Sequence, residues 1–271
     1  TYKLNYNVFE YTWGTPINFD DIELYLKNNS NVKYLAMVHH ETTTGILNSI
    51  EKFSQIGTKY NCVTILDAIS SYCGMRIDIN ETPVDYLMST SNKCIQGMAG
   101  LAFAICDKYK LSLLKSSSKR LYYLSLYDQF DYFEKNGQMR FTPPVQVTYA
   151  LKEAINELFE EGLDARYKRY YENWSILKSG LIKIGFKLLL KPEHESCILI
   201  SIIEPSNKEY KFKKMHDTLY DKGYTIYPGK LKNDKTFRLS IIGDIARKDI
   251  DNFIKCLKNV LIDMGISKIE Y

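Results

Sequence analysis

The sequence lacks the marks of membrane, secreted and metal-binding proteins. No apolar run approaches the ~20 residues that a membrane-spanning helix needs, and residues 1–20 alternate polar and aromatic side chains, without the cationic start and apolar core of a secretory signal. No Cys-x-x-Cys pair occurs, and the four histidines show no metal-ligand spacing. We therefore expect a soluble, cytoplasmic protein with no metal site and no membrane contact.

Strong charge and a disulfide framework are also missing. The net charge of +4 is spread along 271 residues, which does not suggest a nucleic-acid partner. The six cysteines lie far apart and mostly within apolar segments, as reduced and buried thiols do. They are Cys62, Cys73, Cys94, Cys106, Cys197 and Cys256. With 45% hydrophobic residues and no repeat or low-complexity linker, the composition fits one large or two ordinary globular domains.

The first half of the chain alternates between helical and extended patterns. Apolar residues at helical spacing predict helices, and the short apolar runs between them predict strands. The predicted helices are 19–28, 47–60 and 107–114, and the predicted strands are 34–38, 63–66, 86–89 and 101–105. Such alternation predicts an α/β layer fold with a mainly parallel sheet.

The second half begins with two long helical patterns, 145–159 and 163–185, of which the second carries apolar residues at helical spacing with Lys and Arg on the other face. Strands and helices then alternate, in the order strand 197–203, helix 212–222, strand 236–242 and helix 247–264. We therefore predict a large domain over residues 1–160 and a smaller α+β domain over residues 161–271.

Polar residues follow three of the predicted strands. Ligands in open α/β sheets bind outside the carboxyl ends of the strands. Asp67 and Lys93 lie just past two such ends, and the segment His-His-Glu-Thr-Thr-Thr-Gly (39–45) follows a third. A carboxylate that pairs with the ring nitrogen of pyridoxal phosphate and a lysine that binds the same cofactor covalently would together hold it. An acid after a strand can instead cap a helix, and a lone lysine can simply be solvated.

Four segments together resemble the class V aminotransferases, which use pyridoxal 5'-phosphate. They are Glu-Thr-Thr-Thr-Gly (41–45), Asp-Ala-Ile-Ser-Ser (67–71), Ser-Asn-Lys-Cys-Ile-Gln-Gly (91–97) and Tyr-Pro-Gly-Lys (227–230). Residues 92–97 are the most discriminating, because the alanine:glyoxylate and serine:glyoxylate branches have glutamine before the lysine. Within the family the chain resembles the branch that acts on 2-aminoethylphosphonate and pyruvate. The match continues through residues 125–129 and 140–142 to the C-terminus.

The resemblance implies both a fold and a reaction. The fold would be the three-layer transferase fold known as fold type I, with a mainly parallel sheet in the large domain and a smaller C-terminal α+β domain. The reaction would move the amino group of 2-aminoethylphosphonate to pyruvate, giving phosphonoacetaldehyde and L-alanine, or run in reverse in phosphonate biosynthesis. The alternatives are another enzyme of this fold, such as an alanine:glyoxylate aminotransferase or a cysteine desulfurase, and an inactive fragment.

The resemblance also assigns roles around the cofactor. Lys93 would bind the cofactor covalently and then move a proton between the substrate carbon and the cofactor, and Asp67 would pair with the ring nitrogen. Ile69 would pack against one face of the ring, and Thr42 would donate a hydrogen bond near the phenolic oxygen. Asn92, beside the lysine, is counted with the cofactor-binding residues.

Further roles concern the dimer and the substrate. The resemblance implies that Thr142 reaches across a homodimer interface to the partner's cofactor phosphate, and that Arg238 binds the anionic group of the substrate. Cys94 is expected to pack rather than to react. His39 and His40 are expected to line or support the site, without a part in proton transfer.

One part of the family pattern is not found in the sequence. A turn of small residues at a helix N-terminus normally cradles the cofactor phosphate, but no Gly-Ser-Gly-Thr-like segment occurs here. We therefore expect a large domain that is incomplete on its N-terminal side, without this cradle and without the aromatic residue that stacks on the ring. Such a chain should bind the cofactor weakly.

Overall fold

A four-stranded sheet lies at the centre of the first half of the chain. The computed structural model describes residues 4–116, 121–229, 231 and 235–271. In the sheet, the strand order is β1 (Tyr34–Val38), β4 (Val63–Asp67), β5 (Tyr86–Thr90) and β6 (Ala102–Cys106). The first three strands run parallel, and β6 runs antiparallel to β5. The predicted α/β fold with a mainly parallel sheet is therefore confirmed, and all four predicted strands are present.

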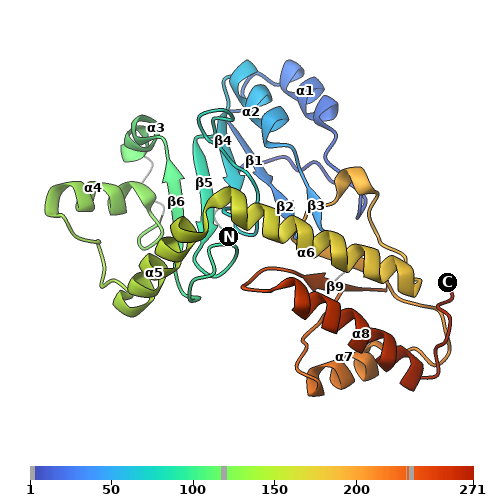
Figure 1. The fold of residues 1–271 in the computed structure, drawn as a ribbon. Coiled ribbons are helices and arrows are strands. Elements are labelled where there is room, and N and C mark those ends of the chain that lie inside the picture. Colours follow the sequence, from blue (N-terminus) through green and yellow to red (C-terminus); the bar gives the residue numbers. More distant parts are fainter. Residues whose placement is uncertain (1–3, 117–120, 230, 232–234) are drawn as a thin grey trace.

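Helices α1 (Phe19–Asn28) and α2 (Ile50–Lys59) pack beside β1 and β4 (Figure 1). Helix α2 begins at Ser49, whose side chain accepts a hydrogen bond from a backbone N–H of the first turn. It lies close to the sheet at Gly57, where a Cβ atom would come within 2.3 Å of Cγ2 of Thr64. The close packing of α2 on β4 therefore depends on the absence of a side chain at Gly57.

The segment after β6 contains α3 (Lys108–Ser112), the short helix η1 (Leu113–Ser116) and α4 (Leu126–Asn136). Sequence reasoning predicted the first of these helices but missed α4. None of the residues of α4 is buried, so its sequence has no fully buried apolar face to recognise. Helix α4 ends at Gly137, which has a left-handed φ of 65°.

Two long helices connect the first sheet to the second half. Helix α5 (Val145–Glu161) is followed directly by α6 (Leu163–Ile184), a helix of 22 residues that runs from the first sheet to the C-terminal unit (Figure 1). Gly162 separates them with φ 83° and ψ 141°, a conformation that non-glycine residues avoid. The predicted division into two helices, 145–159 and 163–185, is confirmed, with the break at Gly162.

The C-terminal unit is a second, separate layer of sheet and helices. Its sheet is antiparallel and three-stranded, in the order β7 (Leu199–Ile203), β9 (Thr236–Ser240) and β8 (Tyr227–Pro228). Helices α7 (Phe212–Asp221) and α8 (Arg247–Asp263) complete the α+β arrangement predicted from the sequence. Fully buried Phe237, Met215 and Leu257 form part of the core that these elements share. The division into domains at residue 160 stays a prediction, because α6 contacts both the turn at residues 91–97 and the C-terminal unit.

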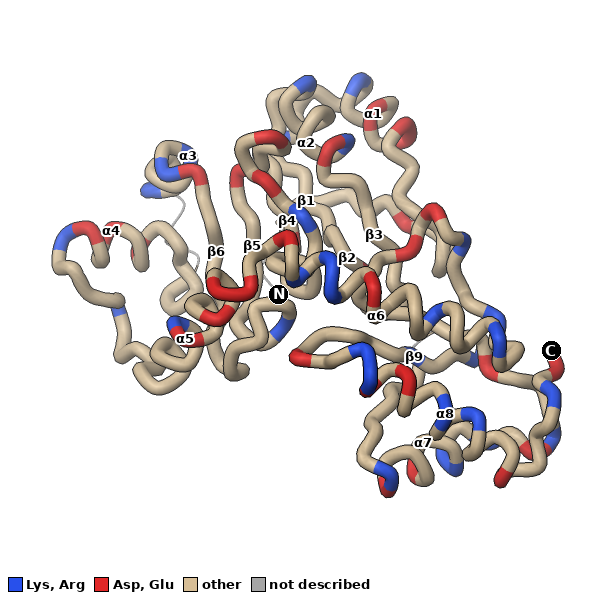
Figure 2. The backbone as a smooth tube through the Cα atoms, viewed as in Figure 1, with Lys and Arg blue, Asp and Glu red and all other residues tan. Residues whose placement is uncertain are grey.

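Several short elements, β8 among them, were not predicted. Strands β2 (His40–Glu41) and β3 (Ile46–Leu47) form a small hairpin, and η3 (Pro192–His194) precedes β7. Ile46 pairs with Glu195, so the hairpin contacts the chain that enters the second sheet. Acidic and basic residues are interspersed along the helices (Figure 2). Within the described ranges, no helix is long and apolar enough to cross a membrane.

Candidate functional site

The carboxyl ends of β1 and β4 lie level with each other, and β5 continues two residues further, to Thr90. Val38, Asp67 and Met88 are register partners across the three strands. The N–H of His39 donates to the carbonyl of Asp67 at 2.9 Å and continues the pairing by one residue. The segments that follow these positions therefore emerge at the same edge of the sheet, where open α/β sheets bind ligands.

Asp67 is the last residue of β4 and is partly buried. Its Oδ1 accepts a hydrogen bond from the backbone N–H of Ile69 at 2.9 Å. The residues that follow form a turn and not a helix, so the alternative role of Asp67 as a helix cap is wrong. In the described part of the chain no donor contacts its other carboxylate oxygen, which can accept a hydrogen bond from a ligand.

Lys93 lies in a tight turn that follows β5. Within this turn, residues 91–97, the N–H of Gln96 donates to the carbonyl of Lys93 at 2.8 Å, and the N–H of Gly97 donates to the carbonyl of Ser91 at 2.8 Å. Ser91 is fully buried, and its hydroxyl donates to the carbonyl of Met98 at 2.5 Å. No described residue forms a hydrogen bond or ion pair with Nζ of Lys93. A hydrogen-bonded turn thus presents an amine that no described residue engages.

Cys94 joins the lysine turn to the segment after Asp67. Its Sγ is fully buried and donates to the carbonyl of Ser70 at 3.3 Å. A Cβ atom at Gly74 would lie 2.3 Å from this sulfur, so the contact is close. Burial raises the pKa of the thiol, which disfavours a reactive thiolate. The structure therefore supports the predicted packing role of Cys94, and it brings the Asp67 and Lys93 segments together.

His39 and His40 are buried behind the site. Nδ1 of His39 lies 2.8 Å from the hydroxyl of Ser71, and Nε2 of His40 lies 2.9 Å from the hydroxyl of Ser196. Burial lowers the pKa of each imidazole to about 4, and for His40 the charges of His39 and Lys93 add to this effect. Both rings are therefore neutral at pH 7, and Nδ1 of His40 is a buried atom without a partner among the described residues.

The turn after β2 is organised by Glu41. Its carboxylate accepts hydrogen bonds from the N–H of Thr43 at 2.6 Å, the N–H of Thr44 at 2.8 Å and the hydroxyl of Thr44 at 2.6 Å. Burial alone would raise the pKa of Glu41, but these hydrogen bonds outweigh it and lower the pKa. The turn is thus fixed from within, and the side chain of Thr42 makes no hydrogen bond with the residues that the structure describes.

Arg238 approaches this turn from the second sheet. It lies on β9, and its Nη1 donates to the carbonyl of Thr42 at 2.7 Å while its Nε donates to the carbonyl of Pro228 at 3.2 Å. From β7, the hydroxyl of Ser201 donates to the carbonyl of Thr43 at 3.2 Å. A guanidinium has five N–H groups, so Arg238 keeps donors for an anion. Lys230, in the segment 227–230, lies outside the described residues.

The other predicted site residues lie farther out on the surface. Asn92 is exposed, and its Oδ1 accepts a hydrogen bond from the hydroxyl of Thr90 at 3.1 Å. Ile69 is 37% exposed and adjoins Asp67. Thr142 is exposed before α5, and no hydrogen bond joins it to any described residue. Arg140 fixes the start of this segment through Asp128 at 3.2 Å. Within one chain, no hydrogen bond between described residues joins Thr142 to Lys93.

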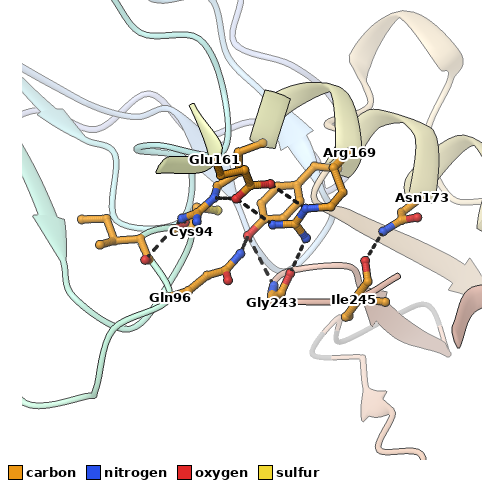
Figure 3. Close-up of polar contacts among 10 residues, drawn as sticks. Cys94, Gln96, Glu161, Arg169, Asn173, Gly243 and Ile245 are labelled. Atoms are coloured by element: carbon orange, nitrogen blue, oxygen red, sulfur yellow. Dashed lines mark hydrogen bonds and ion pairs between the residues drawn. The ribbon is translucent and has the colours of Figure 1, made fainter. Parts of the chain in front are cut away.

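Sequence reasoning missed the residues of α6 that hold the lysine turn (Figure 3). Tyr170 and Arg166 are buried, with exposed fractions of 0% and 3%. Gln96 donates to the hydroxyl of Tyr170 at 2.7 Å, and Arg166 donates to the carbonyl of Cys94 at 3.1 Å. The prediction that the basic residues of this helix face away from the core is wrong for Arg166, because Glu161 and backbone carbonyls compensate its charge. Only the four-residue spacing of these side chains hinted at a shared face.

Comparison with known proteins gives a consistent result. Residues 3–253 match the family described as aminotransferase class-V. A 2-aminoethylphosphonate–pyruvate transaminase of Phocaeicola vulgatus is 38% identical over 261 residues, which cover 96% of this chain and 72% of that protein. A protein of the same name from Bacillus cereus is 40% identical over 244 residues, which cover 89% of this chain and 66% of that protein. The chain therefore spans about two thirds of the length of these relatives.

Solved structures with the same fold are more distant in sequence. A ureidoglycine–glyoxylate aminotransferase of Bacillus subtilis superposes with a TM-score of 0.85 at 22% identity, over 97% of this chain and 68% of that one. A pyridoxamine–pyruvate aminotransferase of Mesorhizobium loti gives a TM-score of 0.87 at 19% identity, over 95% and 67%. At this identity the likeness shows the fold alone, and it confirms the transferase fold expected from the sequence.

Proposed function

The chain belongs to the class V aminotransferase family, and on this premise we propose that it transfers the amino group of 2-aminoethylphosphonate to pyruvate. The products would be phosphonoacetaldehyde and L-alanine, or the reaction would run in reverse. The observation that carries the proposal is that two relatives of this name match most of the chain at 38% and 40% identity. The contact between Arg238 and the Thr42 turn supports it, since it places a guanidinium beside the proposed site.

The residues at the sheet edge fit pyridoxal 5'-phosphate, the cofactor of this family. Nζ of Lys93 has no partner among the described residues, one carboxylate oxygen of Asp67 is free in the same sense, and Nδ1 of His40 is a buried atom without a hydrogen bond. Lys93 would hold the cofactor through its amine, and Asp67 would accept a hydrogen bond from the ring nitrogen. When bound, the cofactor supplies an electron sink for the amine-bearing carbon of the substrate.

Lys93 has the chemistry to move a proton during the transfer. Its amine is on a rigid turn, and a general base must lie within hydrogen-bond reach of the proton that it takes. The neutral imidazoles of His39 and His40 would place no positive charge beside it at pH 7. Thr42, Asn92 and Ile69 would then complete the cofactor site, as the family resemblance implies.

Arg238 would bind the anionic end of the substrate. A guanidinium presents a planar fork that matches a phosphonate or carboxylate. Two of its N–H groups are held by the carbonyls of Thr42 and Pro228, so the remaining ones are oriented before a substrate arrives. Such preorganisation favours the charge-assisted hydrogen bonds that fix an anion.

We further propose that the active unit is a two-fold homodimer in the cytoplasm. Thr142 is exposed and far along the chain from Lys93, as expected of a residue that completes the partner's phosphate site. All six cysteines are free, which suits a reducing compartment.

The test is a visible absorption spectrum of the chain with pyridoxal 5'-phosphate, followed by addition of 2-aminoethylphosphonate. We expect a visible band that the amine bleaches and that pyruvate then restores. In Lys93→Ala the band should be lost, whereas Lys52→Ala, which changes an exposed lysine on α2, should retain it. Bleaching by alanine with recovery on glyoxylate, or reaction with cysteine, would point instead to another enzyme of this fold. No band in the unchanged chain would refute the proposal for this chain.

A further inference from the structure

We propose that Tyr170 is a positioning residue that couples the turn carrying Lys93 to the segment that follows the strand carrying Arg238. Tyr170 lies on α6 and is fully buried. Its hydroxyl oxygen accepts two hydrogen bonds, from Nε2 of Gln96 at 2.7 Å and from the N–H of Gly243 at 3.3 Å (Figure 3). One atom therefore contacts both sides of the site.

On the first side, the contact fixes an unusual backbone conformation. Gln96 has a φ of 66°, in the left-handed region that few non-glycine residues adopt. The N–H of the same residue donates to the carbonyl of Lys93 at 2.8 Å. The hydrogen bond to Tyr170 thus helps to hold Gln96 in a strained conformation on which the orientation of Lys93 depends.

On the second side, α6 holds the segment that leaves β9. Nη1 of Arg169 donates to the carbonyl of Gly243 at 2.8 Å, and Nδ2 of Asn173 donates to the carbonyl of Ile245 at 2.6 Å. Together with Tyr170, these side chains engage both the N–H and the carbonyl of Gly243. Strand β9 ends at Ser240, just before this segment. These contacts therefore fix the C-terminal end of β9 relative to α6.

A second chain of contacts runs beside the first. Nη1 of Arg166 donates to the carbonyl of Cys94 at 3.1 Å, and its Nε contacts Glu161 at 2.6 Å. The other carboxylate oxygen of Glu161 contacts Nε of Arg169 at 2.7 Å. Glu161 thereby links the guanidinium under the lysine turn to the guanidinium that holds Gly243. Removing Glu161 would leave the buried guanidinium of Arg166 without its carboxylate, so Tyr170 offers the milder test.

The consequence is a mechanical link between the two functional sides. Weakening the hydrogen bond of Tyr170 to one segment should also weaken the contacts of the other segment, because both segments are held by the same residue of the continuous helix α6. The effect on catalysis rests on the proposed function of Lys93, whereas the coupling itself does not. The two can therefore be tested separately.

The coupling is tested by hydrogen–deuterium exchange on the full chain, without cofactor. Tyr170→Phe removes only the shared oxygen. We expect exchange to become about tenfold faster in residues 91–97 and also in residues 241–246, with little change in β1 and β4. The matched control is Tyr171→Phe, which removes the hydroxyl of a half-exposed neighbour on the same helix. Unchanged exchange in either segment of Tyr170→Phe would overturn the proposal.

A second variant tests the same link from the other side and leaves the helix intact. Gln96→Asn tolerates a positive φ but is one methylene too short to reach Tyr170. We expect faster exchange in residues 241–246, which Gln96 does not contact. If only residues 91–97 exchange faster, the coupling is refuted. This variant decides the question if Tyr170→Phe fails to fold.

The positioning role has its own spectroscopic readout. If the unchanged chain shows the cofactor band, its pH midpoint should shift in Tyr170→Phe and Gln96→Asn but not in Tyr171→Phe, since the midpoint reports the surroundings of the lysine amine and not global stability. A constant midpoint in all three variants would refute positioning of Lys93. Absence of the band in the unchanged chain would refute the proposed function, and the exchange experiment would still decide the coupling.

Discussion

Nη1 of Arg238 donates to the carbonyl of Thr42 at 2.7 Å, across 196 positions of the sequence. Arg238 lies on β9 of the second sheet, and Thr42 lies in the turn between β2 and β3. Their contact means that the second sheet supplies a cation to the edge at which β1 and β4 end. It also means that the candidate substrate-binding residue, Arg238, contacts the turn that carries a candidate cofactor-binding residue, Thr42.

The first prediction concerns the geometry of Arg238. In Arg238→Lys the ammonium keeps the charge but cannot hold two carbonyls and an anion in one plane. We expect the KM for 2-aminoethylphosphonate to rise about 30-fold, corresponding to about 2 kcal/mol of lost charge-assisted hydrogen bonding. Steady-state kinetics measures this. The control Arg247→Lys changes an exposed arginine on α8 and should leave KM unchanged. Equal KM values in both variants would remove Arg238 from the substrate site.

Much of the fold could be predicted from the sequence because its signals are local. The four strands of the first sheet and the helices near them are set by periodic burial. Strand β4 is an example, since Leu66 is fully buried at the end of an apolar run. Helix α4 and the β2–β3 hairpin were missed because they lack such a local signal. The helix buries no residue, and each strand of the hairpin has only two residues.

The site was predictable only where a motif marks it. Asp67 and Lys93 follow strands, and the structure joins their segments through the contact of Cys94 with Ser70. The support from α6 could not be predicted, because Gln96 and Tyr170 are 74 positions apart and their hydrogen bond depends on where α6 lies relative to the turn at residues 91–97. No spacing rule within one element predicts such a contact.

The second prediction tests the close packing of α2 on β4. Gly57→Ala would place a Cβ atom 2.3 Å from Cγ2 of Thr64, which is buried. We expect a loss of about 1–3 kcal/mol in the free energy of unfolding. Thr64→Ser removes that methyl group and keeps the hydroxyl that bonds to Asp85. The double variant should therefore recover most of the loss in urea unfolding, and equal stability of the double and Gly57→Ala variants would contradict this packing.

The third prediction concerns Thr142 and the proposed dimer. If Thr142 contributes to the partner's phosphate site, Thr142→Ala should weaken cofactor binding about tenfold, in line with the loss of a hydrogen bond to a charged group. The dimer itself should persist, as judged by sedimentation. The control Thr148→Ala changes a threonine on α5 whose hydroxyl bonds only to the carbonyl of Pro144. Normal cofactor affinity of Thr142→Ala in a confirmed dimer would rule out the proposed contact.

The fourth prediction concerns acid stability. Burial lowers the pKa of His40 from 6.5 to about 4 in the folded chain. Between these values the unfolded chain binds a proton that the folded chain does not, so the free energy of unfolding falls as the pH falls from about 6.5 to 4. The loss from this residue reaches about 3 kcal/mol.

His40→Gln removes the titrating group and should flatten the pH dependence of urea unfolding in this range, although it weakens the contact with Ser196 at pH 7. The control is His194→Gln, at a partly exposed position in η3, which should keep the original slope. The assignment would be wrong if His40→Gln lost stability with acid as steeply as the unchanged chain.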